Sequence, residues 1–224
     1  MNFIQLVARV AMECGVTPPT TTISQTDESL RLVSWTNTAW MDIQSAHRDW
    51  QWMRKSASFI TVAGQVSYSP TTDILLTDFG MWSRDTFRNY VTSVGTNSEI
   101  FMNYLDYEEF RNRYLYGALR NTRSRPVEMT ITPDKSIAVG PVPIDGYTVT
   151  GDYFSVPSEM ALDADIPVLP SQFHMAIVYK AMMFYGGFEA ATEVYQRGNE
   201  EFLKIMRRLT ADRLPEIVQC GALA

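Results

Sequence analysis

The amino-acid sequence predicts an α+β fold in which N-terminal helices and a C-terminal helical hairpin surround a central antiparallel β-sheet, followed by an extended C-terminal tail. Apolar residues recur with helical spacing near both ends of the 224-residue chain, the spacing shortens toward alternation between them, and the last residues show no period. We expect residues 1–55 and 170–212 to form one helical domain, residues 56–169 an inserted antiparallel β-rich domain, and residues 213–224 the extended tail.

Two helices are expected before residue 55. Residues 2–14 carry apolar side chains at helical intervals, and Gly15, soon followed by two prolines, ends that helix. A second helix is expected from a cap at Asp27 or Ser29 to about Arg54. Its apolar residues fall on one arc of roughly 160° in helical projection: Leu32, Val33, Trp35, Ala39, Trp40, Ile43, Ala46, Trp50 and Met53.

The stretch 33–53 is rich in tryptophan. Aromatic residues at helical spacing are far more often a core face than a ligand site. We therefore expect His47 to be a core histidine and not a ligand, and Trp52, which lies off the arc, to be partly exposed. The residues assigned to this core helix are Trp35, Trp40, Ile43, His47 and Trp50.

The middle of the chain predicts strands. Residues 56–70 alternate and predict a hairpin with its turn at 63–65. A short helix is expected from Asp106 to Gly117. The other expected strand segments are 81–92, 99–105, 127–133, 135–141 and 147–157. The last three of these predict an antiparallel meander.

Helical spacing returns after residue 170. Ser171 is expected to cap a helix from Gln172 to about Gly186, which is apolar nearly all round and should be buried on most sides, in the fold or between subunits. A last helix is expected at about 191–209, and Lys204, Arg207 and Arg208 suit its C-terminal end. The residues beyond Pro215 show no periodicity.

Composition excludes several classes of protein. The formal net charge of -6 disfavours a protein that binds nucleic acid by neutralising many phosphates. Cys14 and Cys220 have no CxxC spacing, which indicates neither a zinc site nor a disulfide framework and favours a reducing cytosol. The most apolar stretch, 173–188, contains Lys180 and is too short to span a bilayer, so we expect no membrane segment. Residues 1–15 lack a basic leader followed by a long apolar run and a small-residue cleavage site, so we also expect no secretory signal.

Signatures of catalysis are weak. The sequence has two histidines and no GxSxG, HExxH or Gly-rich phosphate loop. Glu108 with Glu109, or Asp163 with Asp165, could supply the two carboxylates that glycoside cleavage needs. Sequence neighbours on a helix do not face one another, which disfavours such a pair. Asp163 and Asp165 resemble a fragment of a calcium loop, but their pattern favours a turn. We expect no catalytic residue, metal or cofactor, and an exposed loop at 120–126, where three arginines lie.

Two stretches carry an ordered set of motifs. Residues 33–53 contain Asn-x-Ala-Trp-x-x-Ile and end in Trp-x-Trp, and residues 137–187 contain a Pro-x-Pro turn, a Tyr-containing strand and a proline before a long apolar helix. In this order and spacing the chain resembles the tailed-bacteriophage adaptor family, the head-to-tail connector proteins that dock beneath the portal ring. Residues 70–125 do not contribute to the resemblance.

The resemblance implies a non-enzymatic virion protein of the neck, assembled in the host cytoplasm. It implies a homo-oligomeric ring, commonly of twelve copies, between the portal protein and a further neck or tail component, with DNA passing through the centre without sequence-specific binding. In such adaptors a C-terminal extension reaches into the portal. The matching residues here are Leu214, Ile217, Val218, Cys220, Leu223 and Ala224. Residues expected to be exposed at subunit borders are Trp52, Met81 and Trp82.

Three alternatives remain open at this point. One is a stopper or tail-completion protein lower in the neck. A second is a virion-associated cell-wall glycosidase that uses carboxylates such as Glu108 and Glu109. A third is a cytosolic ligand-binding or regulatory domain, whose signature would be a closed apolar pocket beside Trp40 and Trp50.

Overall fold

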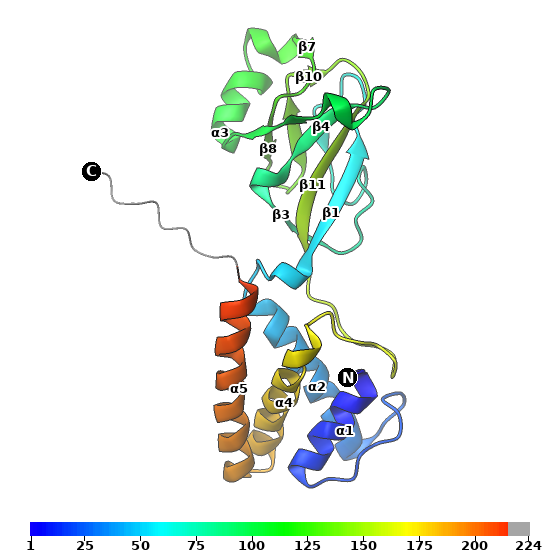
Figure 1. Ribbon diagram of the computed structural model, residues 1–224, viewed down its shortest axis with the longest axis vertical. Helices are drawn as coiled ribbons and strands as arrows, with labels where there is room; N and C mark the ends of the chain where they lie inside the picture. Colours follow the sequence, from blue (N-terminus) through cyan, green and yellow to red (C-terminus); the bar gives the residue numbers. More distant parts are fainter. Residues whose placement is uncertain (215–224) are drawn as a thin grey trace, which may run out of the picture. The chain divides into compact units, whose positions relative to one another are not determined.

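The computed structural model of the protein describes residues 1–214, which divide into two compact units (Figure 1). The helical unit comprises Met1–Met53 and the chain from Pro157 onward, and the β unit comprises Arg54–Val156. Helices and antiparallel strands are both present, so the predicted α+β class is confirmed. Residues 157–169, which we expected in the β-rich domain, lie with the helices.

The helical unit is built from α1 (Phe3–Cys14), α2 (Asp27–Ser45), α4 (Met175–Phe188) and α5 (Thr192–Arg213). The start of α1 is a capping box, because the side chains of Asn2 and Gln5 each accept a hydrogen bond from the other residue's backbone amide. Gly15, with φ 76°, ends α1 at the predicted position. α4 contacts α1, α2 and α5, so it forms the centre of the unit.

The second helix is shorter than we predicted. α2 ends at Ser45, and residues 51–53 form a separate turn of 3-10 helix. Trp50 therefore lies outside the helix on which its spacing had placed it. Its indole Nε1 donates a hydrogen bond of 3.0 Å to the carbonyl oxygen of Ile43. This carbonyl belongs to the last turn of α2, whose acceptors lack hydrogen-bond donors within the helix. The indole N–H of Trp50, which lies beyond the helix, therefore supplies a donor to one of them.

Two glycines bring α4 and α5 close together. A Cβ atom on Gly186 would lie 2.7 Å from the backbone nitrogen of Tyr195, and one on Gly198 would lie 2.9 Å from the carbonyl oxygen of Tyr179. In both cases the obstructing atom is backbone, so a side chain could be accommodated only by moving a helix.

Replacing Gly186 by alanine is therefore expected to lower the free energy of unfolding of the helical unit by about 1–3 kcal/mol, as overpacking does. Gly187→Ala is the matched control, because a Cβ there meets no atom within 4 Å. The control is expected to be neutral or to stabilise by up to about 1 kcal/mol through helix propensity. Chemical denaturation followed by circular dichroism measures both. Equal effects of the two substitutions would refute the proposed tight crossing.

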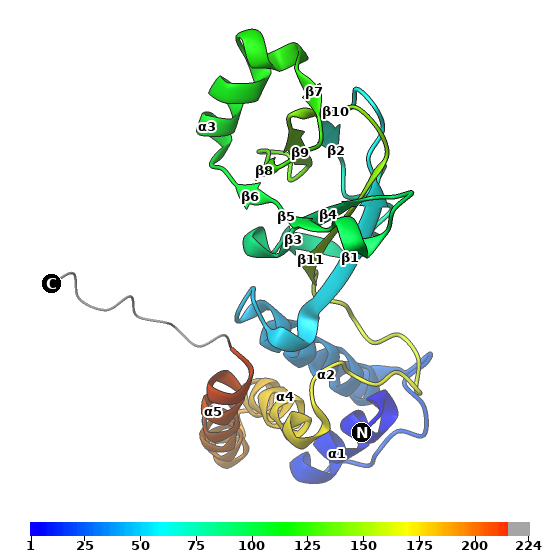
Figure 2. The ribbon, with the colours of Figure 1, turned by 45° about the horizontal axis from the view of Figure 1, so that its top comes forward.

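The β unit contains two main sheets. The strands are β1 (Arg54–Ile60), β2 (Ser67–Tyr68), β3 (Phe79–Trp82), β4 (Arg88–Val91), β5 (Ile100–Phe101), β6 (Asn103–Tyr104), β7 (Arg123–Ser124), β8 (Glu128–Ile131), β9 (Ile137–Gly140), β10 (Val142–Pro143) and β11 (Tyr147–Ser155). One sheet has the order β1-β11-β4-β5, with β3 also paired to β11, and the other has the order β2-β9-β8-β6. Buried side chains of both sheets form one core, and Figure 2 shows the sheets on either side of it.

Strand pairing differs from our predictions in two places. β1 pairs with β11 and β2 pairs with β9, so the expected hairpin at residues 56–70 is wrong. β8 and β9 are antiparallel neighbours, but β11 leaves them for the other sheet, so the expected three-stranded meander is wrong as well. The alternating pattern reflects burial on one face of each strand, and both sheets bury such a face in the shared core.

Some pairs in the β unit are parallel. β6 pairs with β8, and β7 pairs with β10, in parallel register. The helix expected between Asp106 and Gly117 is found as α3 (Tyr107–Phe110), which continues as a π-helical turn, Arg111–Leu115.

Candidate interaction surface

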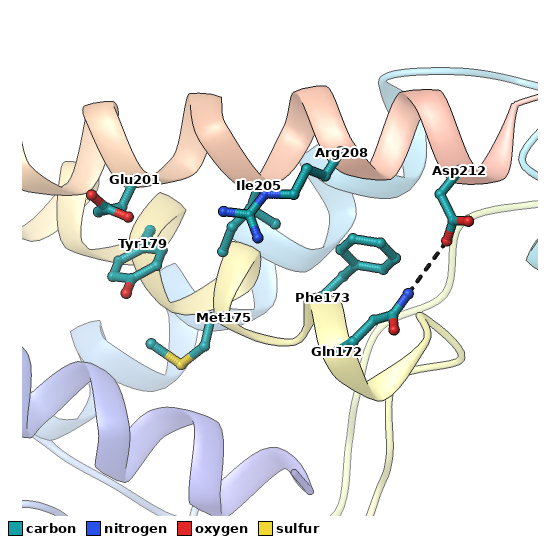
Figure 3. A pocket seen from close by; sticks show the side chains of 8 residues that line it. All are labelled: Gln172, Phe173, Met175, Tyr179, Glu201, Ile205, Arg208 and Asp212. Atoms are coloured by element: carbon teal, nitrogen blue, oxygen red, sulfur yellow. Dashed lines mark hydrogen bonds between the residues drawn. The ribbon is translucent and has the colours of Figure 1, made fainter.

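A groove lies between α4 and α5 in the helical unit. It encloses about 550 Å³ and is lined by residues of α5, of α4 and of the 3-10 turn Ser171–Phe173 that precedes α4 (Figure 3). Its apolar lining consists of Phe173, Met175, Tyr179 and Ile205. Its polar lining consists of Gln172, Glu201, Arg208 and Asp212.

The sequence of α5 creates one wall of the groove. Glu201, Ile205, Arg208 and Asp212 follow each other at intervals of three or four residues and so share one side of the helix. α5 packs chiefly on α4, and its buried residues are Gly198 and Leu209. Much of the helix surface is thus left to solvent, and the groove belongs to this open part.

The charged residues of the groove differ in whether they have a partner within the subunit. Glu201 pairs with Lys204 at 2.5 Å, and Asp212 accepts a hydrogen bond of 3.3 Å from Gln172. Arg208 has no ion-pair partner within residues 1–214. Asp212 also pairs with Arg213 at 3.0 Å. The charged lining therefore consists of one unpaired cation and two paired carboxylates, so the groove has no excess of positive charge and offers a mixed apolar and polar surface for non-covalent contact.

The loop of residues 157–170 is held firmly against the rest of the helical unit. The Asp163 carboxylate accepts hydrogen bonds from the Thr21 hydroxyl at 2.7 Å and from the Thr22 amide at 2.6 Å. The Asp165 carboxylate accepts bonds from the amides of Ala161 and Leu162. These donors lower the pKa of both aspartates below the usual range. The predicted turn is confirmed, and the carboxylates are engaged by the protein itself.

His174 fixes the end of this loop. Its side chain is buried, with Nε2 2.9 Å from the carbonyl oxygen of Leu169 and Nδ1 2.7 Å from the Met1 amino nitrogen. An ammonium group can only donate, so Nδ1 accepts and Nε2 carries the proton. Burial lowers the pKa of His174, and the Met1 charge lowers it further, against the raising effect of the bond to Leu169.

This arrangement predicts a pH dependence. Below about pH 6.5 the unfolded chain protonates His174 while the folded chain does not, so the helical unit should lose stability as the pH falls from 7.5 to 5. Thermal unfolding followed by circular dichroism across this range measures the effect. His174→Gln, which cannot titrate, should show a smaller slope over the same range. Parallel curves for the two proteins would contradict the prediction.

The predicted core helix is found only in part. Trp40 and Ile43 are buried in α2, and Trp50 is buried beyond its end. Trp35 is half-buried, with its ring 6.1 Å from Tyr185 and 5.5 Å from Phe188. His47 is also half-buried and meets Trp50 edge-on at 4.9 Å.

Trp52 fills the space in which a ligand-binding domain would need a closed apolar pocket. Its half-buried ring stacks on Trp40 at 5.5 Å and on Trp50 at 5.6 Å. A protein side chain thus occupies the position beside both rings where a closed apolar pocket would lie. The tryptophan cluster is therefore packing, in agreement with the sequence-based interpretation.

The expected border residues have different environments. Met81 is half-buried, but Trp82 is only 4% exposed and lies in the core of the β unit. Its Nε1 donates a hydrogen bond of 2.8 Å to the carbonyl oxygen of Lys135. The expectation that Trp82 is exposed is therefore wrong, because its side chain points into the core that the two sheets share.

The predicted docking tail is described only at its first residue. Leu214 is half-buried and caps the end of α5. The remaining tail residues, Ile217, Val218, Cys220, Leu223 and Ala224, lie outside the described residues.

The carboxylates considered for catalysis lack a suitable setting. Glu108 is 74% exposed at its side chain and lies 3.7 Å from Arg111, and Glu109 is exposed beside it on α3. Glu201 and Asp212 in the groove are eleven residues apart on one helix, or about 16 Å along its axis, which exceeds the separation that glycosidases use. Within residues 1–214 no cluster of His, Cys, Asp or Glu is arranged to hold a metal ion.

Sequence reasoning missed the groove and the exposed loop. Arg208 is expected as a charge at a helix C-terminus, and residues 157–169 are expected in the β-rich domain, with a turn at Asp163 and Asp165. One signal in the sequence could have indicated the groove. Ile205 is followed three residues later by Arg208, on a helix whose surface is otherwise mostly polar. Among the described helices, none is both long and apolar enough to cross a membrane.

Comparison with known proteins identifies the family. A search of curated proteins gives no match. A family model described as SU10 adaptor protein matches residues 1–219, a range that includes both units and also residues 70–125, which the motifs had left out. The resemblance drawn from the motifs is confirmed by this match. The chain therefore belongs to the SU10 adaptor protein family, a family of bacteriophage head-to-tail adaptors.

Proposed function

We propose that this phage adaptor protein forms a ring beneath the portal and lets DNA pass from the capsid to the tail. The observation that carries the proposal is the family match over residues 1–219, which spans the helical unit, the β unit and half of the tail. The role is structural and non-enzymatic, and the ring is expected to hold about twelve copies, a closed cyclic assembly.

Two properties of the chain support a ring around DNA. A ring made of one repeated contact needs surfaces that are still open in a single subunit, and the groove beside α5 is such a surface. A net charge of -6 disfavours strong binding to DNA phosphates, which suits a channel through which DNA must slide.

The tail supplies the proposed contact with the portal. Residues 215–224 include Ile217, Val218 and Leu223, which can bury apolar surface on a partner. Leu214 at the end of α5 is the point from which this segment departs.

The test is the mass of the complex formed with the portal protein encoded beside this chain, measured by size-exclusion chromatography with light scattering. Addition of about twelve copies to one portal ring is the expected result. A chain that stays monomeric beside the portal would contradict the proposal. A chain that binds only after another neck component has been added would instead indicate a stopper or tail-completion protein.

A further inference from the structure

The arginine-rich loop expected at residues 120–126 lies at one end of the β unit. Residues 120–124 are exposed as predicted, whereas Arg125 is half-buried and Pro126 is buried. β7, which is part of the loop, pairs with β10, and the Gly64 amide beyond the end of β1 donates to a β10 carbonyl at 2.9 Å. Figure 1 shows β7 at the end of the unit opposite the start of β1, where the chain enters and leaves. The loop therefore forms the far tip of the unit.

Two arginines hold the loop in place on either side. The Arg125 guanidinium donates hydrogen bonds of 2.8 Å to the side-chain oxygen and to the carbonyl oxygen of Asn89. On the other side, Arg111 donates to the Tyr116 hydroxyl at 2.9 Å and lies over its ring. A loop held in this way loses little conformational entropy when it meets a partner.

The loop presents five consecutive polar side chains that have no partner within the described chain. None of these side chains forms a hydrogen bond or an ion pair with residues 1–214: Arg120, Asn121, Thr122, Arg123 and Ser124. Arginine, asparagine, threonine and serine are all residue types that donate to phosphate oxygens in protein–DNA complexes. The centre of a protein–protein interface is instead apolar and aromatic. This composition therefore favours a phosphate partner over a protein partner.

The segment around the loop is positively charged, although the chain as a whole is acidic. Residues 110–127 contain five arginines and no aspartate or glutamate, whereas the formal net charge of the chain is -6. Glu109 is exposed on the neighbouring helix α3. Other flanking carboxylates are engaged: Glu108 with Arg111 at 3.7 Å, Glu128 with Arg113 at 2.6 Å, and Asp145 with the Gly146 amide at 2.8 Å. Arg120 and Arg123 thus keep their charge available for an external anion.

We propose that residues 120–124 contact the phosphate backbone of duplex DNA, with Arg120 and Arg123 each donating to a phosphate. A guanidinium presents two parallel N–H groups that match two phosphate oxygens. The loop has only a short 3-10 turn and a two-residue strand, so it offers no long helix or ribbon to read bases in the major groove. The contact is therefore independent of sequence. It rests on the proposed function, since that function brings DNA to the protein.

The contact is weak in each subunit, which suits DNA that has to slide. Two phosphate contacts correspond to a slope of about -1.8 when the logarithm of the binding constant is plotted against the logarithm of the salt concentration. In a ring the same contact is repeated in every copy, so weak contacts add to hold the DNA. Each of them can still break and form again as the DNA moves.

Binding of a fluorescently labelled duplex of mixed sequence tests the contact. Fluorescence anisotropy is measured between about 25 and 200 mM salt, for the full chain alone and after mixing with the portal. The double variant Arg120→Gln, Arg123→Gln is expected to bind about tenfold more weakly or worse at low salt, and to lower the salt slope by about 1.8. The matched control is Arg207→Gln, Arg208→Gln, which removes two exposed arginines of α5 and gives the same net charge. The control should bind like the unmodified chain.

The outcomes separate the DNA contact from the portal role. Loss of binding in the control equal to that in the loop variant would show a net-charge effect and would overturn the contact, as would the absence of salt-dependent binding by the unmodified chain in both samples. A loop variant that binds DNA normally but no longer joins the portal complex would identify a protein contact and overturn the proposal. If the chain binds DNA through the loop but stays monomeric beside the portal, the contact stands and the proposed function fails. Circular dichroism verifies that each variant is folded.

Discussion

Replacement of Trp40 by alanine is expected to lower the free energy of unfolding of the helical unit by about 3–5 kcal/mol, the cost of removing a large side chain from a packed core. Trp40 is 1% exposed and its ring stacks on Trp52, so removal of the indole leaves a cavity that can close only if α2 moves. Denaturant titration followed by circular dichroism measures the change.

Leu203→Ala is the control for this prediction. Leu203 is 45% exposed on α5, so its loss should change the free energy of unfolding by about 0.5 kcal/mol or less. If Trp40→Ala proved as mild as Leu203→Ala, the tryptophan cluster would not be the structural core of the helical unit, and a binding role for it would have to be reconsidered.

Deletion of residues 215–224 is expected to leave the fold intact and to weaken binding to the portal by about 100-fold or more, equivalent to about 2.7 kcal/mol. The segment carries three large aliphatic side chains, and burial of even two of them on the portal would supply this free energy after the cost of ordering. Light scattering of mixtures with the portal measures the occupancy over a range of concentrations.

Two measurements make this deletion informative. The truncated chain should show the same thermal unfolding and circular dichroism as the full chain, since helix α5 ends at Arg213, before the deleted segment. A truncated chain that binds the portal at full strength would remove the tail from the docking surface. Binding would then have to be sought on the helical unit or the β unit.

Helix existence could be predicted from sequence more reliably than helix extent. The apolar spacing of α1 and the stop at Gly15 depend on neighbouring residues alone, and the structure matches them. The spacing of Trp50 also fits a helix, but the chain turns after Ser45. The side-chain bond from Trp50 to Ile43 is a tertiary interaction, and periodicity contains no information about it.

Strand partners could not be predicted because they lie far apart along the chain. Alternation identified Phe59 as a residue of a strand with one buried face, but its partner across the ladder is Val149, some ninety residues later. A local turn signal at residues 63–65 suggested the wrong neighbour. Trp82 was placed at a surface for the same reason, since its burial depends on a second sheet that only the fold brings to it.

The interaction surfaces were hidden because each consists of residues with ordinary local explanations. Arg208 suits the end of a helix, and Ile166 beside a proline suits a connector. Their significance depends on what the fold does to their neighbours. The fold buries Leu169, engages the Asp163 carboxylate in a hydrogen bond with the Thr22 amide, and leaves Ile166 exposed to solvent. A pattern of exposure is a property of three-dimensional packing, and the sequence specifies it only through the complete fold.

The strand pair β1–β11 has a consequence for how this protein can change. The β unit begins at Arg54 and ends at Val156, and Arg54 is the ladder partner of Phe154, so its entry and exit are neighbours. A unit whose two ends adjoin can be excised, exchanged or enlarged through one pair of junctions without cutting a helix. We expect the β unit to be the modular part of this adaptor, suited to grafting and to recombination, while the helical unit retains its own connectivity.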